Sequence, residues 1–484
     1  MQIRLRILSE EQIKEIIQDA YRALKEIGVL VQNKDAEVLL LDHGAKILNS
    51  NRISIPENMI EKALSTAPSS IKLYDRDKKL CMNLEGDCVY FNPGSAAINI
   101  LVDNNIVRKP KVNDYIEFTK VVDRLDHIDA QSTSIKPADI PEEISDLYRL
   151  FIALQYCTKP VITGTFGEYG FKFMKEMLVV IRDSEEELKE YPLAIFDCCP
   201  TPGLRWEKPR CQDLIECARL GIPSELISMP QPGLTSSITL YDSLVQHTAE
   251  TLSGIVIAQL ACIGAPVIYG GSPVMTNLRS ASAPALIGDS NTHKMDCAYS
   301  QIGKYLGLPT HSYMGLTDSK LIDFQAGAET SNGIMLGALA GINNISGPGM
   351  LDCESCQSIE KLIIDNEYCG SAKQFIREIK KRNDPLEPLK YLTIPGVISD
   401  PEHTLLWLEE EHFEPGKVIY RDVLPDKPMS EKAISVEKLN IFQRAKERAK
   451  EILNSYEHKP LETHKLGHLK DIVNSAGEKI GFSI

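Results

Sequence analysis

Eight short apolar segments recur along the middle of the chain, and each is followed by a longer segment of helical character. Successive apolar segments begin roughly 30–45 residues apart, which is the length of one strand, one helix and their loops. They are Val89–Asn92, Ile128–Ser132, Pro160–Thr163, Leu193–Cys198, Leu226–Met229, Pro266–Tyr269, Thr310–Met314 and Asn344–Ser346. This alternation predicts an α/β protein whose eight parallel strands close into a (β/α)8 TIM barrel.

Glycine and proline clusters follow several of these strands, as in Pro200–Gly203, Pro230–Gly233 and Gly347–Gly349. They allow sharp backbone turns, and they gather at one end of the strands, which favours a closed barrel. The alternative is an open, doubly wound sheet. That fold would require a phosphate-binding loop after the first strand, and Asn92–Ala96 does not have the required glycine pattern.

Segments on both sides of the barrel are expected to be extensions. The predicted boundaries are 1–85 for an N-terminal helical and hairpin cap, 86–390 for the barrel, and 391–484 for a C-terminal helical extension. Ser9 and Gln12 form a capping box that predicts the start of the first helix. Further helices are expected at Asp35–Gly44, Pro56–Ala67, Pro401–Glu411 and Ser435–Asn454, with a hairpin at Lys72–Met82. The last two helices are expected to pack on the outside of the barrel or to mediate dimerisation.

Charge and composition exclude several classes of protein. The chain has 484 residues and a formal net charge of −14, which argues against non-specific binding of nucleic acid. The N-terminus lacks the apolar core of a signal peptide, and the longest apolar runs are interrupted by polar residues, glycine and proline. We therefore expect a cytoplasmic protein without membrane segments.

The 12 cysteines do not predict a metal site. Cys353 and Cys356 form a single CxxC pair, which without a second pair is a weak zinc signal. Cys198 and Cys199 close a predicted strand, and no histidine is evidently paired with them. Because HxH and HExxH patterns are also absent from the sequence, no bound metal is expected.

The polar side chains expected at the barrel mouth are mainly amides and aromatics. Chemistry in such barrels occurs at the carboxyl ends of the strands. We see no pair of carboxylates at these ends and expect little proton transfer there. Aromatic faces with an acid nearby suit a quaternary ammonium ion. The candidate substrate-binding residues are Asn92, Phe166, Gln231, Tyr269, Arg279, His311, Tyr313, Gln325 and Glu329.

Several of these candidates have a plain structural alternative. His311, Tyr269 and Tyr313 are equally suited to packing inside or around the barrel, and Glu329 to pairing with a surface lysine. No residue is expected to act as a nucleophile or as a general acid or base.

A set of longer sequence stretches carries a resemblance to a known family. They are LSEEQIKEIIQDAYRALKEIGVLV from Leu8, GGSPV from Gly270, LPTHSYMGLTDSKLIDFQAGAE from Leu308, GPGMLD from Gly347, IEKLIIDNEYCG from Ile359 and SDPEHTLLWLEEEHFEPGKVIYR from Ser399. Over nearly its whole length the chain resembles the trimethylamine methyltransferase family, in the branch that lacks pyrrolysine.

The resemblance implies a fold and an activity. Family members are (β/α)8 barrels with extensions at both ends. They transfer a methyl group from an amine to the cobalt(I) of a partner corrinoid protein that docks at the barrel mouth. The resemblance therefore implies a corrinoid carried by the partner, with no cofactor tightly bound by this chain. A third protein passes the methyl group to tetrahydrofolate or coenzyme M. We also expect a homo-oligomer.

The missing pyrrolysine bears on the substrate. Members that contain this residue use it for tertiary amines, and only standard residues are present here. The resemblance therefore favours a quaternary amine such as glycine betaine, proline betaine, carnitine or γ-butyrobetaine. A quaternary nitrogen leaves as a neutral amine, so no general acid is needed.

Roles for the mouth residues follow from their strand positions. Tyr269, Tyr313 and Phe166 would hold the cation by their ring faces, and Glu329 would add negative charge. A betaine carboxylate would be bound by His311, Gln231, Asn92 or Arg279. Gln325 would look toward the mouth with Glu329. The corrin ring would approach Gly347, Pro348, Gly349 and Met350, because glycine permits close contact with the backbone.

Two other classes of function compete with this one. One is a different barrel enzyme that carries its own metal. The other is a protein that binds a betaine or docks a corrinoid protein without catalysis.

Overall fold

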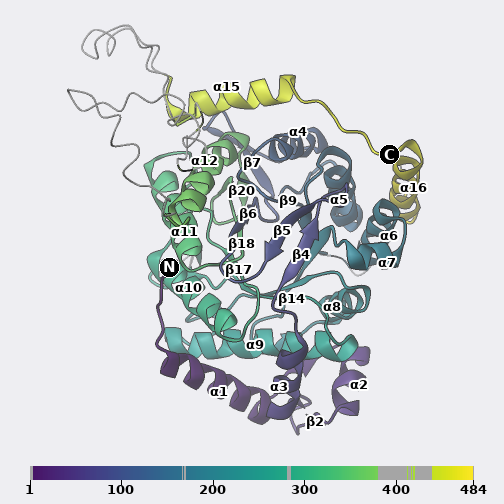
Figure 1. Cartoon of the computed structure of the whole chain (residues 1–484), viewed down its shortest axis with the longest axis vertical. Helices are drawn as coiled ribbons and strands as arrows, with labels where there is room; N and C mark the ends of the chain where they lie inside the picture. The colour runs from purple at the N-terminus through teal and green to yellow at the C-terminus, as the bar shows by residue number, and fades with distance from the viewer. Residues whose placement is uncertain are drawn as a thin grey trace, which may run out of the picture.

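A closed ring of eight parallel strands forms the centre of the protein (Figure 1). The structure is a computed structural model that describes residues 4–165, 167, 170–280, 285–379, 411, 416, 418–419 and 439–482. Five strands run in the order β14-β13-β11-β10-β9 and three in the order β17-β18-β6. A parallel bridge between Tyr269 and Thr310 joins β14 to β17, and the Asp129 N–H donates to the Phe91 carbonyl between β9 and β6. Each strand is therefore next to its successor in the chain, which confirms the (β/α)8 barrel.

The observed elements follow the predicted alternation. The barrel strands are β6 (Tyr90–Asn92), β9 (Gln131–Ser132), β10 (Val161–Thr163), β11 (Ala194–Cys198), β13 (Ser224–Ser228), β14 (Val267–Gly271), β17 (His311–Tyr313) and β18 (Asn344–Ser346). The helices that follow them are α4 (Val112–Asp123), α5 (Ser145–Tyr156), α6 (Gly170–Arg182), α8 (Lys208–Leu220), α9 (Leu240–Ala261), α10 (Ser290–Tyr305), α11 (Phe324–Leu339) and α12 (Ile359–Phe375). Figure 1 shows these helices around the strands.

A hairpin closes the amino end of the barrel. It consists of β4 (Ile71–Tyr74) and β5 (Leu80–Leu84), and it crosses the middle of the ring in Figure 1. Its apolar side chains pack with the lowest layer of the barrel interior, and this cluster contains Ile71, Leu73, Met82, Leu84, Ala130, Ile162, Ile195 and Ile268. The hairpin predicted at Lys72–Met82 is therefore present, and it leaves the carboxyl end of the barrel for a ligand site.

Helices before the barrel lie along its outer layer. α1 (Glu10–Glu26) begins with the expected capping box, in which the Gln12 N–H donates to Ser9 Oγ over 3.2 Å. α1 and α3 (Glu57–Thr66) contact α9, and α2 (Lys34–Asp42) contacts both α8 and α9. An antiparallel pair, β2 (Lys46–Ile47) and β3 (Ile53–Ser54), lies between α2 and α3 in the chain.

The N-terminal region also holds in place a loop that comes much later in the chain. β1 (Leu30–Val31) pairs in parallel with β12 (Arg205–Trp206), which lies between β11 and α8. The guanidinium of Arg52 donates to the carbonyls of Gly203 and Leu204 over 3.0 and 3.2 Å. These contacts hold the segment that leads into α8.

Loops at the carboxyl ends of the strands carry small sheets. One has the order β19-β20-β7-β8 and combines the loops after β6 and β18. Its strands are β7 (Asn99–Val102), β8 (Ile106–Arg108), β19 (Met350–Leu351) and β20 (Cys356–Gln357). A second pair, β15 (Met275–Thr276) and β16 (Ala285–Leu286), belongs to the loop after β14.

Two C-terminal helices pack on the outside of the barrel. α15 (Ile441–Asn454) contacts α12 and α4, while α16 (Thr463–Glu478) contacts α6 and α5 (Figure 1). The helix expected at Pro401–Glu411 lies outside the described residues except for its last position. The division of the chain at residues 85 and 390 stays a prediction.

Candidate active site

A cavity of about 490 Å³ opens among the loops at the carboxyl ends of the strands. Its polar lining includes Asp197, Arg210 and Glu354, and its apolar lining includes Ile227 and Met229. This is the end of the barrel at which TIM-barrel proteins place their chemistry.

Two carboxyl side chains meet beside this cavity. Asp197 on β11 lies opposite Glu225 on β13 in the strand register, so the two carboxyl groups are neighbours. Burial raises the pKa of Asp197 to about 7 and raises the pKa of Glu225 well above its usual range. Near neutral pH the pair therefore carries one negative charge rather than two.

A third carboxyl group, Glu354, enters from the turn between β19 and β20. Asp352, Cys353 and Glu354 have φ angles of 50°, 51° and 68°, so three successive non-glycine residues are left-handed. The neighbouring loop holds this turn, with the Asp352 N–H donating to the Ser319 carbonyl and Cys353 Sγ lying 3.0 Å from an oxygen of Asp318. Left-handed backbone of this kind costs on the order of 1 kcal/mol per residue and persists only where surrounding contacts hold it.

The environment of Glu354 is that of a buried acid. Its Oε1 atom is buried and has no hydrogen-bond partner among the residues described. Burial raises the pKa of Glu354 to about 7, and a hydrogen bond with Ser272 opposes part of this rise. A buried carboxyl group without a counter-ion is costly when ionised, so a bound cation would stabilise it.

Arg210 is a basic side chain of the cavity lining. It lies in the first turn of α8, where its Nη1 donates to Thr165 Oγ1 over 2.9 Å and lies 3.9 Å from Asp213 Oδ2. The Thr165 hydroxyl donates in turn to Asp213. Burial raises the pKa of Asp213 to about 6, and the Arg210 charge opposes the rise in the pKa of Asp197.

A hydrogen-bonded polar layer inside the barrel supports the carboxyl pair. Asn92 Nδ2 donates to Asn344 Oδ1 and Ser346 Oγ, both over 2.9 Å, and Asn344 Nδ2 donates to Glu225 Oε1 over 2.9 Å. His311 Nε2 lies 3.0 Å from Ser346 Oγ and 3.7 Å from Glu225 Oε2. Burial lowers the pKa of His311 to about 3, so the ring is neutral and its contact with Glu225 is not an ion pair. Asn92 and His311 therefore orient other side chains here.

Among the candidates from the sequence that the structure describes, Tyr313 lines the cavity. Its side chain is 6% exposed and its hydroxyl donates to the Ser95 carbonyl over 3.3 Å. Its ring stands edge-on to that of His311, with 5.1 Å between the ring centres. Phe166 lies outside the described residues.

Other candidates lie away from the cavity. The Tyr269 hydroxyl donates to Thr248 Oγ1 on α9 over 3.0 Å, so this side chain packs between the barrel and its helices. Glu329 accepts hydrogen bonds from the Asp318 N–H and the Thr317 hydroxyl, and exposed Gln325 donates to it over 2.8 Å.

Two candidates from long loops are also absent from the cavity lining. Gln231 begins a turn after β13, with its N–H donating to Thr235 Oγ1, and Arg279 is exposed in the loop after β14. The structure thus brings together a different set of polar residues from the one expected.

The four residues expected to face the corrin ring, Gly347–Met350, are all buried. Met350 packs in a cluster with Tyr313 and Leu316, and the Gly349 N–H donates to Asp365 Oδ2 over 2.7 Å. In this structure they form part of the wall behind the cavity.

The expectation that no carboxyl pair lies at the strand ends is wrong. The fifth strand was expected to begin at Leu226, whereas β13 begins at Ser224 and includes Glu225. An acid in an otherwise apolar strand, as Asp197 is in Ala194–Cys198, was an available signal for a buried charged site. Glu354, which was not among the expected site residues, lies between Cys353 and Cys356, and both of these cysteines are free thiols.

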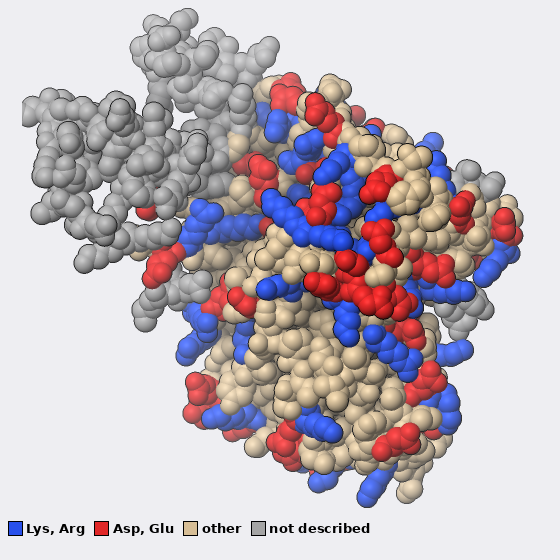
Figure 2. All heavy atoms as spheres, turned by 45° about the vertical axis from the view of Figure 1, so that its right-hand side comes forward, with Lys and Arg blue, Asp and Glu red and all other residues tan. Residues whose placement is uncertain are grey.

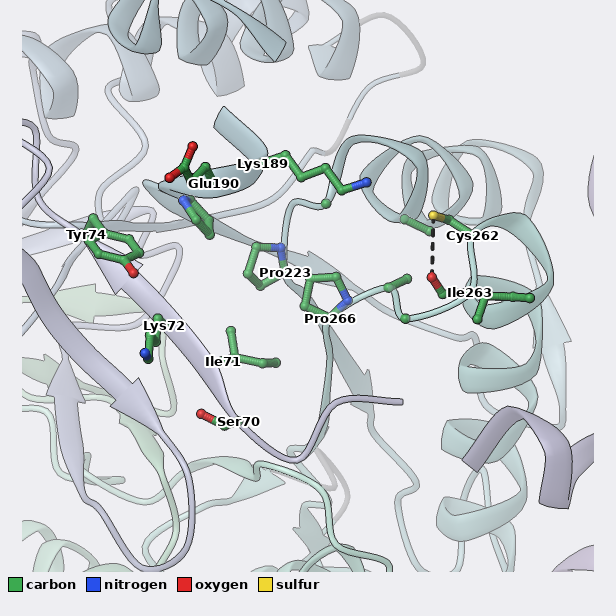
Figure 3. Close-up of a pocket in the computed structure, with 15 residues that line it drawn as sticks. Ser70, Ile71, Lys72, Tyr74, Lys189, Glu190, Pro223, Cys262, Ile263 and Pro266 are labelled. Carbon is green, nitrogen blue, oxygen red and sulfur yellow. Dashed lines mark hydrogen bonds between the residues drawn. The ribbon is translucent and has the colours of Figure 1, made fainter. Parts of the chain in front are cut away.

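A second cavity, of about 270 Å³, lies at the opposite end of the barrel (Figure 3). Pro223 and Pro266, which directly precede β13 and β14, line it together with Lys72 and Tyr74 of the hairpin. Its position at the amino ends of the strands separates it from the carboxyl groups described above.

The remaining surface features are unexceptional. On the face shown in Figure 2, acidic and basic side chains are interspersed across the upper half, and the middle of the lower half is mostly uncharged. Within the described ranges, no group of three or more His, Cys, Asp or Glu residues is arranged to hold a metal ion. In the same ranges, no helix has both the length and the apolar character needed to span a membrane.

A closed barrel with a cavity that charged side chains line at the carboxyl ends of its strands is the architecture of a TIM-barrel enzyme. The chain belongs to the trimethylamine methyltransferase (MTTB) family, whose model matches residues 2–481. It is therefore a methyltransferase, of a family whose named members act on amines.

Relatives with different substrates in their names are similar to this chain. Trimethylamine methyltransferase MttB of Desulfitobacterium hafniense is 28% identical over 477 residues, which cover 98% of this chain and 94% of that protein. Trimethylamine methyltransferase MttB of Methanosarcina thermophila is 31% identical and covers 79% of this chain and 80% of its own length. Glycine betaine methyltransferase of D. hafniense is 26% identical and covers 98% of both chains.

A solved structure supports the fold. The monomethylamine methyltransferase MtmB of Methanosarcina barkeri matches 94% of this chain and 89% of its own, with a TM-score of 0.51 and 10% sequence identity.

Proposed function

We propose that this protein transfers a methyl group from a quaternary amine to the cobalt(I) of a partner corrinoid protein. The observation that carries the proposal is the cavity at the barrel mouth, in which Asp197 and Glu354 lie near the Tyr313 side chain. Buried acids beside an aromatic ring provide the environment that a permanent organic cation requires.

The cation would be bound mainly by charge. The Asp197–Glu225 pair retains one proton, and Glu354 has a pKa of about 7 in the absence of a cation. A quaternary ammonium ion cannot donate a hydrogen bond, so it needs negative charge and polarisable surface around it rather than aligned acceptors. Its positive charge would favour the ionised form of Glu354 and so lower that pKa.

The proposed reaction requires the protein to position the substrate and does not require acid–base catalysis. Cobalt(I) of the partner supplies the electron pair that forms the new bond to the methyl carbon. The C–N bond breaks with both electrons remaining on nitrogen, which leaves as a neutral tertiary amine, so no proton is transferred. The chain must hold one N–methyl bond in line with the approaching metal.

The side chains in and beneath the cavity are consistent with a reaction that needs neither a proton donor nor a nucleophile from this protein. His311 is neutral and buried beneath the cavity, which makes it unsuited to donate a proton to a leaving group. Among the described residues that line the cavity, Cys199 is the one thiol, and burial raises its pKa, so it is a poor nucleophile near neutral pH.

The partner protein would dock over the loops at this end of the barrel. Apolar side chains are exposed on the loops after β13 and β14, at Met229, Leu234, Ile238 and Leu278. Ile238 and Leu278 both lie against Gly233, so they form one patch. This patch is a better candidate for the partner contact than Gly347–Met350, which are buried.

A methylation assay tests the function directly. We expect the protein to methylate a cobalt(I) corrinoid protein with at least one betaine and not with trimethylamine, followed as loss of the cobalt(I) absorbance. Methylation by trimethylamine would contradict the assignment of a quaternary substrate. Failure with every amine, in the presence of a corrinoid protein that a related methyltransferase can methylate, would contradict the function itself.

Substitution of Tyr313 tests the aromatic contact. We expect Tyr313→Ala to raise the KM for the amine roughly 3- to 30-fold, because a cation–π contact contributes about 0.5–2 kcal/mol. Tyr313→Phe keeps the ring face and should stay within about threefold of the wild type. If Tyr313→Ala instead unfolds most of the protein and leaves the KM of the folded fraction unchanged, the ring serves packing alone.

A further inference from the structure

The charges around the mouth cavity have a definite arrangement. In the ring order β6-β9-β10-β11-β13-β14-β17-β18, β11 and β18 lie four strands apart in either direction. Arg210 enters from α8, which follows β11, and Glu354 enters from the turn that follows β18. Because strands four apart lie across an eight-stranded barrel, the guanidinium and the Glu354 carboxyl approach the cavity from opposite sides.

Other side chains of the lining accompany each of these two charges. On the Glu354 side, Tyr313 comes from the adjacent strand β17 and offers an aromatic ring to a cation. On the Arg210 side, the lining includes Thr165, whose hydroxyl accepts from Arg210 Nη1. The first turn of α8 also lies on this side, and its N-cap residue Glu207 forms no side-chain cap. The positive end of this helix has the same sign as Arg210, while the carboxyl groups of Glu207 and Asp197 also belong to the lining on this side.

We infer that Arg210 binds a carboxylate of the substrate, which is therefore a zwitterion with a quaternary ammonium group at one end and a carboxylate at the other. The inference rests on the proposed function and narrows its substrate class. A guanidinium recognises a carboxylate by charge-assisted hydrogen bonds, and the ammonium end would then lie toward Glu354 and Tyr313. Arg210 replaces His311, Gln231, Asn92 and Arg279 in the role that was expected of them.

The position of Arg210 is held by contacts that do not involve substrate. Thr165 orients its Nη1 group, and Asp213 lies behind it at 3.9 Å. The pairing of β1 with β12 fixes the segment just before α8. A side chain positioned in this way loses less conformational entropy when it binds an anion.

The experiment compares a zwitterion with a cation of similar shape that lacks the carboxylate. Binding of γ-butyrobetaine, glycine betaine, choline and tetramethylammonium to the full chain is measured by calorimetry, and KM and kcat are measured with the corrinoid protein. The variants are Arg210→Gln, Arg210→Lys and, as a control on the same helix, Arg219→Gln. Arg219 lies in the last turn of α8, where it pairs with Glu216.

We expect the wild type to bind at least one of the two zwitterions more tightly than either carboxylate-free cation. Arg210→Gln should weaken binding of that zwitterion roughly 10- to 100-fold, the usual range for loss of hydrogen bonds to a charged group. It should leave the carboxylate-free cations unchanged or bound more tightly, because the cavity becomes more negative. Arg210→Lys should restore part of the zwitterion affinity, and the loss in Arg210→Gln should appear in KM more than in kcat. Arg219→Gln should match the wild type.

Two results would overturn the inference. One is equal loss of zwitterion and cation binding in Arg210→Gln and Arg210→Lys, which would assign Arg210 to structural support of Asp213 and Thr165. The other is a wild type that uses choline or tetramethylammonium as well as it uses the zwitterions. In either case methyl transfer by the wild type would still support the proposed function. Absence of methyl transfer with every amine would instead refute the proposed function.

Discussion

Glu354→Gln is expected to weaken binding of the quaternary amine at least tenfold, which corresponds to about 1.4 kcal/mol. The substitution keeps the shape of the side chain and removes the charge that lies closest to the proposed ammonium position. Measurements of KM and of the dissociation constant by calorimetry check this result. Since no proton is transferred in the proposed reaction, kcat should change much less than KM.

The same variant should be more stable than the wild type at alkaline pH. The pKa of Glu354 is raised to about 7 in the folded protein, so the folded state retains a proton that the unfolded state has released. Ionisation of Glu354 therefore lowers the free energy of unfolding as the pH rises from about 4 to above 7, by up to about 3 kcal/mol. Glutamine has no such cost, so we expect a higher Tm for Glu354→Gln near pH 8 and little difference near pH 4.

A matched control comes from the helix that follows. Glu360 lies in the first turn of α12 and accepts a hydrogen bond from the Ser358 hydroxyl outside the mouth cavity. Glu360→Gln should leave amine binding unchanged. If Glu354→Gln binds the amine as tightly as the wild type and is no more stable at alkaline pH, then Glu354 neither binds the cation nor destabilises the folded protein when it is ionised.

Amine binding is expected to strengthen as the pH rises from about 6 to about 8. Burial places the pKa values of Asp197 and Glu354 at about 7 in the unliganded cavity, so below pH 7 the carboxyl groups are increasingly neutral. A quaternary cation binds the cavity when its carboxyl groups are ionised. At lower pH these groups hold protons, which must be released before the cation can bind. For each proton displaced, the affinity falls by up to about tenfold per pH unit, and it becomes constant above the pKa.

Other charged groups near the cavity do not reverse this direction. His311 has a pKa of about 3 and stays neutral throughout the range. Asp213 has a pKa of about 6 and titrates in the same direction as the cavity acids. Calorimetry of the chain alone, in two buffers of different ionisation enthalpy, would measure both the affinity and the protons released. An affinity that is constant from pH 6 to pH 8, with no proton release, would contradict the acidic cation site.

The repeating alternation of apolar strands and helical segments made the fold predictable from the sequence. Parallel barrel strands are buried on both faces, so they appear as apolar runs, and the helices between them have their own period. The N-cap of α1 was also predictable, because a capping box depends on residues only three positions apart. The expected strand that contains Asp197 coincides with β11 to within one residue at its start.

The residues of the candidate site were much harder to predict from the sequence. Tyr313 was expected in the cavity from its place at the end of a strand, and it does line the cavity. Tyr269 is also at the end of an expected strand, but the alternation of β14 turns it outward, toward Thr248 on α9. A one-residue difference in register exchanges the inner and outer faces of a strand, and strand ends are uncertain by more than that in a sequence.

The sequence by itself determined the barrel, its order of strands and the family, because these depend on periodicity and on long stretches of local pattern. Only the tertiary structure decided which charges meet. Asp197 and Glu225 become neighbours through strand pairing, and Arg210 and Glu354 face one cavity although 144 positions separate their numbers in the chain. The pKa of each acid depends on how deeply packing buries it, and burial is a property of all the surrounding elements together.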